Sequence, residues 1–595
     1  MPELKKREDM DSRYQWRLED MYASQDAFEA DFEKAGAGIA AFAAYEGHVS
    51  ENPAGIVKAY FELKETVEKL YVYSSMRRDA DAGKAEYQQL FQRAQGLSVR
   101  FETACAFLTP ELLSMDEGAL KDLMKDPSMK DYDTFLRGVL REKPHVLPGE
   151  QEKLLSMAQD VLSGPADAFG MLNNVDLPMP EVKNADGSTE KLTQVTYGIR
   201  LRSRDREARR SAFEGMMNAF KSFSSTISVL YSSAVKGDLF IARARKFPSC
   251  LEASLYPDEV PVSVYENLLE SVKGTLPALT EYLNIRKKRL GVDELHMYDL
   301  YVPIADSFDM KLSFEEAYDL VLEALRPLGE DYVSVLRAAR HAGWADVYEN
   351  KNKRSGAYSW GCYDTHPYVL LNHTDDLNGC MTLAHELGHA MHSYFSNGAQ
   401  PFAKAGYSLF VAEVASTCNE VLMLRHLMKK YAGDKAATAF LCNQLLESFR
   451  TTLFRQAMFA AFEKRVHEMA EKGEPLTADS MTAEYLALNG LYYGGGCTVD
   501  ELIGAEWMRI PHFYTSFYVY KYATGFSAAV AIADRILREG ESAVKDYRRF
   551  LSAGGSVPPL EALRWAGVDM EKKETVDSAM RVFADTVKQL GAALE

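Results

Sequence analysis

The chain has 595 residues, a formal net charge of -18 at pH 7, and 47% hydrophobic and 26% charged residues. This length exceeds what one ordinary hydrophobic core needs, so we expect several domains or one large helical body with fused lobes. The composition excludes the disordered, collagenous and coiled-coil classes, and the acidic balance argues against nucleic acid as a partner because phosphate contacts require Lys or Arg.

The cysteines and the N-terminal residues indicate a cellular compartment. Seven cysteines are scattered along the chain and form no C-x-x-C pair, which is typical of a reducing environment. The first residues carry charges where a signal peptide needs an apolar stretch, and no run of about 18 apolar residues occurs. We therefore expect a cytoplasmic protein with no membrane partner; the sequence carries no signal for its oligomeric state.

Helical periodicity dominates the sequence, and strand signals fall in only two places. The first is 170–199, where extended segments flank an Asn184-Ala185-Asp186-Gly187 turn. We place a domain boundary at the end of this region. It separates an N-terminal helical lobe, residues 1–199, which ends in a β-hairpin-like segment, from a second domain, residues 200–595.

Several helices downstream carry their own start and stop signals. S-x-x-E patterns that begin at Ser263 and Ser313 predict capping boxes, in which each Ser and the following Glu satisfy N–H groups of the first turn. Apolar spacing predicts a helix over 446–472 that ends at Gly473. The glycines at 494–496 lack the Gly-Lys-Ser/Thr of a phosphate loop, so we expect a flexible loop there.

The second strand signal, 357–373, directly precedes the segment that carries chemistry. His385-Glu386-Leu387-Gly388-His389 matches H-E-x-x-H. Residues four apart share one face of a helix, so His385 and His389 can present imidazole nitrogens to one ion. Glu386 lies about 100° round the helix, where its carboxylate can reach a water beside that ion without being a ligand. Zinc is the natural occupant.

A catalytic zinc site needs a third protein ligand. His392 lies about 10 Å along the helix from His385, too far for both to bind one ion, so we place it behind the site or in the core. The offsets of the metzincin class are absent. Glu413, an acid among Val and Ala in a following helix, is our third ligand, because a metal ion compensates its buried charge. Glu420 either orients an imidazole or is a solvated helix residue.

Five segments spread over almost the whole chain match the pattern of one family. By these segments the chain resembles the oligoendopeptidase F branch of the thimet oligopeptidase (M3) family of metallopeptidases. The resemblance implies a mainly α-helical bowl or clamshell with a deep central channel that admits oligopeptides, and a small β-sheet beside the zinc helix. The segments are Tyr14–Tyr22, Ser355–Ser359, Thr382–His392, Phe410–Glu420 and Pro511–Tyr514.

The resemblance also implies roles for residues. One zinc ion would be held by His385, His389 and Glu413, with Glu386 as the general base, in agreement with the spacing. In the family, a late segment carries a His and tyrosines that hold substrate and the tetrahedral intermediate. The matching residues here are His512, Tyr518 and Tyr522.

Both late tyrosines have an alternative, and so does the strand before the zinc helix. If the late segment is helical, Tyr514, Tyr518 and Tyr522 form one stripe, and such a stripe equally suits core packing. Gly356, Ala357 and Tyr358 resemble the substrate-facing strand edge of the family, where a peptide adds through main-chain hydrogen bonds. A purely structural hairpin is the other interpretation.

The expected function is a zinc metalloendopeptidase that hydrolyses internal bonds of oligopeptides with a zinc-activated water. One alternative is a zinc carboxypeptidase or dipeptidyl carboxypeptidase, which motif spacing does not separate from it. A second alternative, from another class, is a peptide-binding protein whose zinc is structural. Structural zinc sites are normally closed by four protein ligands, often cysteines. We expect no cysteine in the zinc helix itself, although Cys380 and Cys418 are close in sequence.

Overall fold

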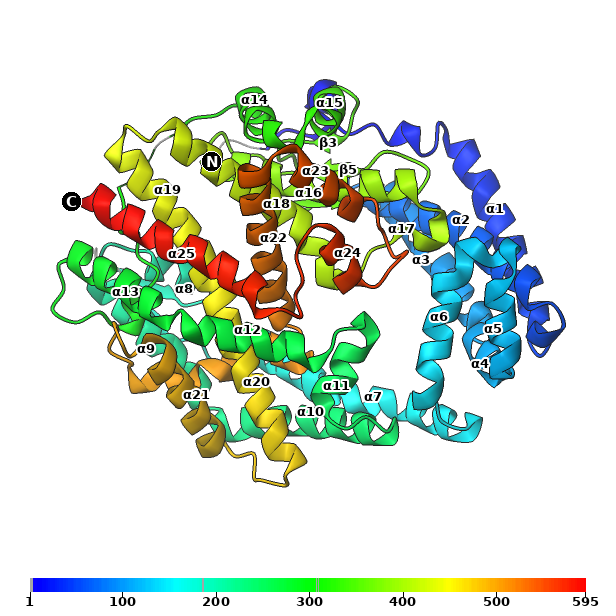
Figure 1. Ribbon diagram of the computed structural model, residues 1–595, viewed down its shortest axis with the longest axis horizontal. Coiled ribbons are helices and arrows are strands. Elements are labelled where there is room, and N and C mark those ends of the chain that lie inside the picture. The colour runs from blue at the N-terminus through cyan, green and yellow to red at the C-terminus, as the bar shows by residue number, and fades with distance from the viewer. Residues whose placement is uncertain (1–3, 184–186, 307, 309) are drawn as a thin grey trace. The chain divides into compact units, whose positions relative to one another are not determined.

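The computed structural model describes residues 4–183, 187–306, 308 and 310–595, which form a mainly helical protein with small sheets (Figure 1). This confirms the predicted fold class. The chain divides into two compact units: unit 1 is Met1–Pro144, Asp309–His426 and Ile532–Val568, and unit 2 is His145–Phe308, Leu427–Ala531 and Asp569–Glu595. The predicted boundary near residue 200 divides the chain at one point, whereas each unit consists of three separate segments. The two-domain division therefore stays a prediction.

Unit 1 packs its N-terminal helices and a three-stranded sheet around a shared core. Trp16, Phe28 and Leu70 from the first part of the chain cluster with Tyr368 and Leu370 of the sheet. The N-terminal helices therefore support the strands that precede the H-E-x-x-H helix. The elements wholly within unit 1 are α1 Gln25–Phe42, α2 Pro53–Ala80, α3 Ala85–Cys105, α4 Leu108–Ser114, α5 Glu117–Lys125, α6 Asp133–Glu142, α14 Phe314–Ala324, α15 Glu330–Ala339, β3 Ala345–Asp346, β4 Tyr358–Trp360, β5 Tyr368–Leu370, α16 Leu377–Ala399, α17 Phe402–Ala405, α23 Glu541–Leu551 and α24 Pro559–Trp565.

The sheet of unit 1 has the strand order β3-β5-β4. The central strand β5 is buried along its length, pairs in parallel with β3 and pairs antiparallel with β4, in the register Tyr358↔Leu370 and Trp360↔Tyr368. Both strands predicted within 357–373 are thus confirmed. β4 lies at the edge of the sheet, and α16 packs against β4 and β5.

Unit 2 is a helical body in which the C-terminal helix α25 lies along α12 and α19 (Figure 1). β1 and β2 form an antiparallel pair in the predicted hairpin region, and residues 184–186 of its predicted turn lie outside the described residues. The elements wholly within unit 2 are α7 Gly149–Met171, β1 Glu181–Lys183, β2 Thr189–Lys191, α8 Gln194–Leu201, α9 Arg206–Lys221, α10 Ser224–Ala244, α11 Cys250–Leu255, α12 Val262–Gly274, α13 Leu276–Leu290, α19 Lys435–Ser448, α20 Arg455–Glu471, α21 Ala478–Tyr493 and α25 Lys573–Leu594.

Two helices continue from one unit into the other: α18 (Leu409–Lys430) and α22 (Tyr520–Glu539). Short 3-10 segments in unit 2 complete the architecture: η10 (Met297–Asp299), η13 (Glu501–Arg509) and η14 (Pro511–Tyr514). Among the described residues, no helix is both long and apolar enough to cross a lipid bilayer.

The predicted helix signals are confirmed in part. Ser313 caps α14 and forms the capping box with Glu316. The box predicted at Ser263 is wrong, because α12 already begins at Val262, after Pro261 in an extended conformation, which leaves Ser263 inside the helix. The helix predicted over 446–472 consists of the end of α19, a π-helical turn and α20, and Gly473 follows it in the left-handed conformation at φ 75°.

The three glycines at 494–496 form a turn after α21, which confirms the predicted loop, and they pack tightly against their neighbours. A Cβ on Gly495 would lie 2.5 Å from Oγ1 of Thr280, and one on Gly496 would lie 2.8 Å from Cβ of Leu283. Glycine is needed here because the chain after α21 passes against α13 at a distance that excludes any side chain. These glycines fix a packed turn.

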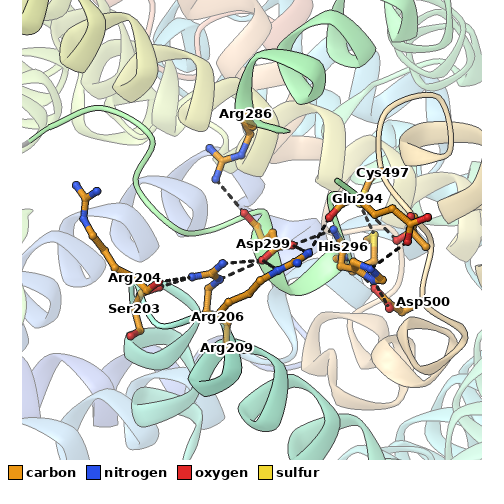
Figure 2. Close-up of polar contacts among 12 residues, drawn as sticks. Ser203, Arg204, Arg206, Arg209, Arg286, Glu294, His296, Asp299, Cys497 and Asp500 are labelled. Carbon is orange, nitrogen blue, oxygen red and sulfur yellow. Dashed lines mark hydrogen bonds and ion pairs between the residues drawn. The ribbon is translucent and has the colours of Figure 1, made fainter. Parts of the chain in front are cut away.

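A buried ionic cluster ties the elements of unit 2 together (Figure 2). The carboxylate of Asp299, fully buried at the end of η10, accepts hydrogen bonds from Arg209 on α9 at 2.7 Å and from Arg206 at 2.9 Å. Arg286 of α13 donates to the main-chain carbonyl of Asp299 at 3.2 Å. Nearby, His296 contacts Asp500 through Nδ1 at 2.8 Å. Protein cations thus fully partner the Asp299 carboxylate.

Candidate metal centre

The helix that carries the two histidines starts at a well-defined cap. The side chain of Asp376 accepts a hydrogen bond from the Gly379 amide at 2.8 Å, which satisfies one of the N–H groups left open at the start of α16. His385 and His389 follow one turn apart on α16. Their imidazole rings have a centroid separation of 4.9 Å, so they face one point in space.

Gly388 brings the second helix to these histidines. A Cβ on Gly388 would lie 2.5 Å from Cα of Ser416 and 2.7 Å from the carbonyl oxygen of Ala415, so only glycine allows α16 and α18 to approach this closely. Buried Asn419 of α18 donates to the carbonyl of Ala384 at 3.0 Å and joins the helices again. This close crossing places Glu413 beside the two imidazoles.

Three donor atoms converge at this crossing. Nε2 of His385 and Nε2 of His389 lie 3.2 Å apart, and Oε2 of Glu413 lies 3.5 and 3.4 Å from them. A tetrahedral zinc ion with bonds of about 2.0–2.2 Å holds its ligand atoms about 3.3–3.6 Å apart. The triangle therefore has the size of one face of a zinc tetrahedron, and the donor types suit zinc. Among the described residues, this is the group of His, Cys and acidic side chains found able to hold a metal ion.

Hydrogen bonds behind the triangle orient its members. Nδ1 of His385 contacts Oε1 of Glu420 at 3.0 Å, which turns Nε2 toward the other donors. The hydroxyl of Ser416 donates to Oε2 of Glu413 at 3.0 Å. Of the two alternatives for Glu420, the structure shows the imidazole contact.

The charges of the triangle are mutually dependent. The hydrogen bond with His389 is the main cause that lowers the pKa of Glu413 to about 2, against the effect of burial. Burial lowers the pKa of His385, but its hydrogen bond with Glu420 and the nearby carboxylates outweigh burial and raise that pKa to about 9. In the absence of a metal ion, a proton on His385 compensates the nearby carboxylates.

Glu386 is buried beside the triangle with an uncommitted oxygen. It is 6% exposed, and its Oε2 atom is buried without a hydrogen-bond partner. Burial is the largest cause that raises the pKa of Glu386 above its ordinary value. A carboxyl group of this kind is suited to taking a proton from a water molecule at the triangle.

His392 lies in the core, one of the two places predicted for it. Its ring stacks on Tyr407 with centroids 3.7 Å apart and lies 5.2 Å from the ring of Phe550. Burial lowers the pKa of His392 to about 3, so the ring is neutral. It contributes packing beneath the site and is absent from the donor triangle.

The predicted substrate strand lies on the sheet edge of unit 1. Gly356 has a left-handed φ of 84°, and its carbonyl accepts a hydrogen bond from Asn372 at 2.8 Å. Ala357 follows, immediately before β4. The hydroxyl of Tyr358 donates to Asp79 at 3.1 Å, so this side chain is tied to the N-terminal helices. β4 therefore presents main-chain N–H and C=O groups at the outer edge of the sheet.

His512, Tyr518 and Tyr522 gather within unit 2. Their rings have pairwise centroid separations of 6.0 Å for His512–Tyr518, 5.9 Å for His512–Tyr522 and 5.4 Å for Tyr518–Tyr522. We call these three side chains the late aromatic trio. Burial lowers the pKa of His512, so the ring favours its neutral form.

The late segment is not one helix, so the condition for a stripe of Tyr514, Tyr518 and Tyr522 is not met. η14 ends at Tyr514 and α22 begins at Tyr520, and a bent connection separates them. Tyr514 instead stacks on Phe169 with centroids 4.4 Å apart, and Tyr520 is fully buried. The trio assembles through the bend.

Sequence analysis missed the role of Gly388 at the centre of the site. A glycine inside a helix costs about 1 kcal/mol relative to alanine, so its presence between the two histidines required a reason. Close helix crossing is such a reason. The signal was visible in the H-E-x-x-H segment, but it does not reveal which helix crosses there.

Known proteins share this architecture. The model of peptidase family M3 matches residues 199–582, and that of oligopeptidase F matches residues 111–178. The chain is 40% identical to oligopeptidase PepF of Bacillus subtilis, over 99% of this chain and 88% of that protein. It is 36% identical to group B oligopeptidase PepB of Streptococcus agalactiae, over 98% of both. The crystal structure of oligoendopeptidase-F from Enterococcus faecium superposes with a TM-score of 0.73 at 32% identity, covering 96% of this chain and 99% of that one.

Proposed function

We propose that this protein is a zinc-dependent oligoendopeptidase. The chain belongs to peptidase family M3 and is therefore a peptidase, and part of it matches the oligopeptidase F model. His385, His389 and Glu413 would hold one zinc ion, and Glu386 would act as general base. The observation that carries the proposal is the triangle of donor atoms at 3.2, 3.4 and 3.5 Å beside the uncommitted oxygen of Glu386. Its substrates would be short peptides, as the names of its relatives say of those proteins.

Each side chain has a part in the proposed hydrolysis. A zinc ion bound at the triangle would supply Lewis-acid activation of water and of the scissile carbonyl. Glu386 would take a proton from the attacking water and pass it to the amine that leaves, so the peptide bond breaks with net addition of one water. Its raised pKa suits both transfers, since the group must accept a proton and then release it. Glu420 would keep His385 oriented throughout.

The late aromatic trio and the β4 edge would serve the substrate. His512, Tyr518 and Tyr522 offer N–H and O–H donors suited to the negative charge that develops on a carbonyl oxygen. Gly356, Ala357 and Tyr358 would offer main-chain groups to an extended peptide, which explains how a peptidase can accept many sequences. Replacing Tyr518 or Tyr522 by Phe removes only a hydroxyl, and a fall in kcat with unchanged zinc content supports the role of the donor.

The experiment that tests the function uses one peptide blocked at both ends. Incubation with the full-length protein should give internal cleavage products by mass spectrometry. A chelator should abolish the cleavage and added zinc should restore it. Cleavage that persists in a metal-free protein contradicts the zinc mechanism. Cleavage of free but not of blocked peptides favours the carboxypeptidase alternative.

A further inference from the structure

The bend that assembles the late aromatic trio is held by side chains from three helices of unit 2. The main-chain N–H of Phe517 donates to Oε1 of Glu463 on α20 at 2.6 Å. The carbonyl of Ser516 accepts from the hydroxyl of Ser254 on α11 at 2.9 Å. The hydroxyl of Ser516 donates to Asp238 on α10. Two consecutive residues of the bend thus have three anchors.

The bend adopts a conformation that its own sequence disfavours. Phe517 has a φ of 53°, in the left-handed region that bulky residues rarely occupy. Its side chain is nearly fully buried, and its ring lies 4.5 Å from the ring of His467 on α20. Tertiary contacts therefore impose this backbone, and the residue they constrain directly precedes Tyr518.

Glu463 is an unusual choice for a purely structural position. It is fully buried, its Oε2 atom has no hydrogen-bond partner, and the N–H of Phe517 is the donor to its Oε1 atom. Burial, with the nearby Asp238, raises the pKa of Glu463 well above its ordinary value, which favours the neutral form of the carboxyl group. Burying this carboxyl group costs desolvation free energy and gains one hydrogen bond, from the Phe517 amide. That hydrogen bond fixes the bend.

From these contacts we infer that Glu463 is a positioning residue of the peptidase: by holding the Phe517 amide it sets where Tyr518 and His512 present their donors. This inference rests on the proposed function of the trio and adds a residue outside it. His512 and Tyr518 are linked to the anchored bend through Thr515, whose N–H donates to the carbonyl of His512 at 2.9 Å and whose carbonyl accepts from Tyr518 at 3.2 Å. A shift of the bend therefore moves both side chains.

Two substitutions at one position separate positioning from packing. Glu463→Gln keeps an uncharged acceptor of the same shape, and kcat should stay within about threefold of wild type. Glu463→Leu keeps the volume but leaves the Phe517 amide unpaired, and kcat should fall roughly 10- to 100-fold, the cost of displaced catalytic groups. Because the trio is proposed to act on the developing charge, KM should change little. Glu468→Leu, on the solvent side of the same helix, is the matched control.

The assay is steady-state cleavage of an internally quenched oligopeptide, with zinc content and thermal unfolding recorded for every variant. A kcat of Glu463→Leu near wild type overturns the inference, as does a Gln variant as impaired as the Leu variant. If the Leu variant does not fold, Ser516→Ala decides: it removes one anchor and should lower kcat about threefold to tenfold, whereas an unchanged kcat overturns the inference.

Failure of the proposed function would look different. If the wild-type protein binds zinc but cleaves no peptide, the endopeptidase proposal is rejected. The hydrogen bond from the Phe517 amide to Glu463 is then tested by a structural measurement. Hydrogen exchange of the segment around Phe517, followed by mass spectrometry, should then be slow in wild type and in Glu463→Gln and fast in Glu463→Leu. Equal exchange in all three proteins rejects the anchor itself.

Discussion

Asp299 in unit 2 and Glu413 in unit 1 are both carboxylates in polar clusters, but their partners differ. Asp299 is fully buried and receives hydrogen bonds from two guanidinium groups, which outweigh burial and lower its pKa (Figure 2). Glu413 has a side chain that is 46% exposed and faces two imidazoles, which carry charge only when protonated.

The difference in partners predicts a different behaviour for each cluster. Arginine remains charged at all ordinary pH values, so the Asp299 cluster is complete when the chain has folded and serves stability. Imidazoles can lose their protons to solvent when a cation binds, so the Glu413 cluster suits the metal ion proposed for it. Substitutions in the first should change unfolding, and substitutions around the second should change metal binding and turnover.

The largest effect is expected from Glu386→Gln, which leaves the donor triangle intact. The amide is unable to take a proton from water, so kcat should fall about 10²- to 10⁴-fold or more. Zinc content, measured by atomic emission, should match wild type because Glu386 is not in the triangle. A variant that keeps its activity removes the general-base assignment, and one that loses its zinc shows that Glu386 supports the metal.

Asp299→Asn should disrupt the buried ionic cluster of unit 2. It leaves Arg209, which is 3% exposed, without its anionic partner, and removing one partner of a buried ion pair costs about 3–5 kcal/mol of stability. The midpoint of thermal or urea unfolding should fall clearly, while zinc content per folded molecule stays the same. Glu294→Gln, at an exposed position of the same cluster, should shift stability by less than about 0.5 kcal/mol. Equal shifts for the two variants contradict the contrast.

Glu420→Gln tests the donor triangle through the residue that orients His385. The amide is a weaker partner for Nδ1 of His385, so the imidazole should be a poorer ligand and zinc affinity should fall about 10- to 100-fold. Competition with a chromophoric chelator measures this directly. Stability of the metal-free protein should fall by less than in Asp299→Asn, because the Glu420 side chain is 33% exposed. A large loss of stability without loss of zinc affinity would show that Glu420 is structural.

The contrast also explains what the sequence revealed. The convergence of the histidine pair and Glu413 was predictable because spacing along a helix is local and an acid among Val and Ala has few explanations. The burial expected for Glu413 was wrong, since its side chain is 46% exposed. The bend at Phe517 and the packed turn at Gly495 were not predictable, because side chains from distant helices impose them: Glu463 on the first, Thr280 on the second. Pro261 likewise moved a helix start that the Ser263 pattern alone placed too late.

The most specific effect, about tenfold for each pH unit, is the pH dependence of metal binding. The pKa of His385 is raised to about 9 in the metal-free protein, above its ordinary 6.5. A folded-state pKa above the unfolded value contributes stability that is present below about 6.5 and is lost as pH rises through about 9. The bound proton must leave before zinc binds, so zinc affinity should rise about tenfold per pH unit up to about pH 9.

Glu413 does not contribute to the pH dependence of zinc affinity between pH 6 and 9. The pKa of Glu413 is lowered to about 2, so its stabilising contribution is present above its ordinary 4.5 and is lost only as pH falls through about 2. Chelator competition between pH 6 and 9 therefore reports on His385 rather than on Glu413. A flat affinity would mean that His385 is already unprotonated, and the contrast with the Asp299 cluster would then rest on geometry rather than on exchangeable charge.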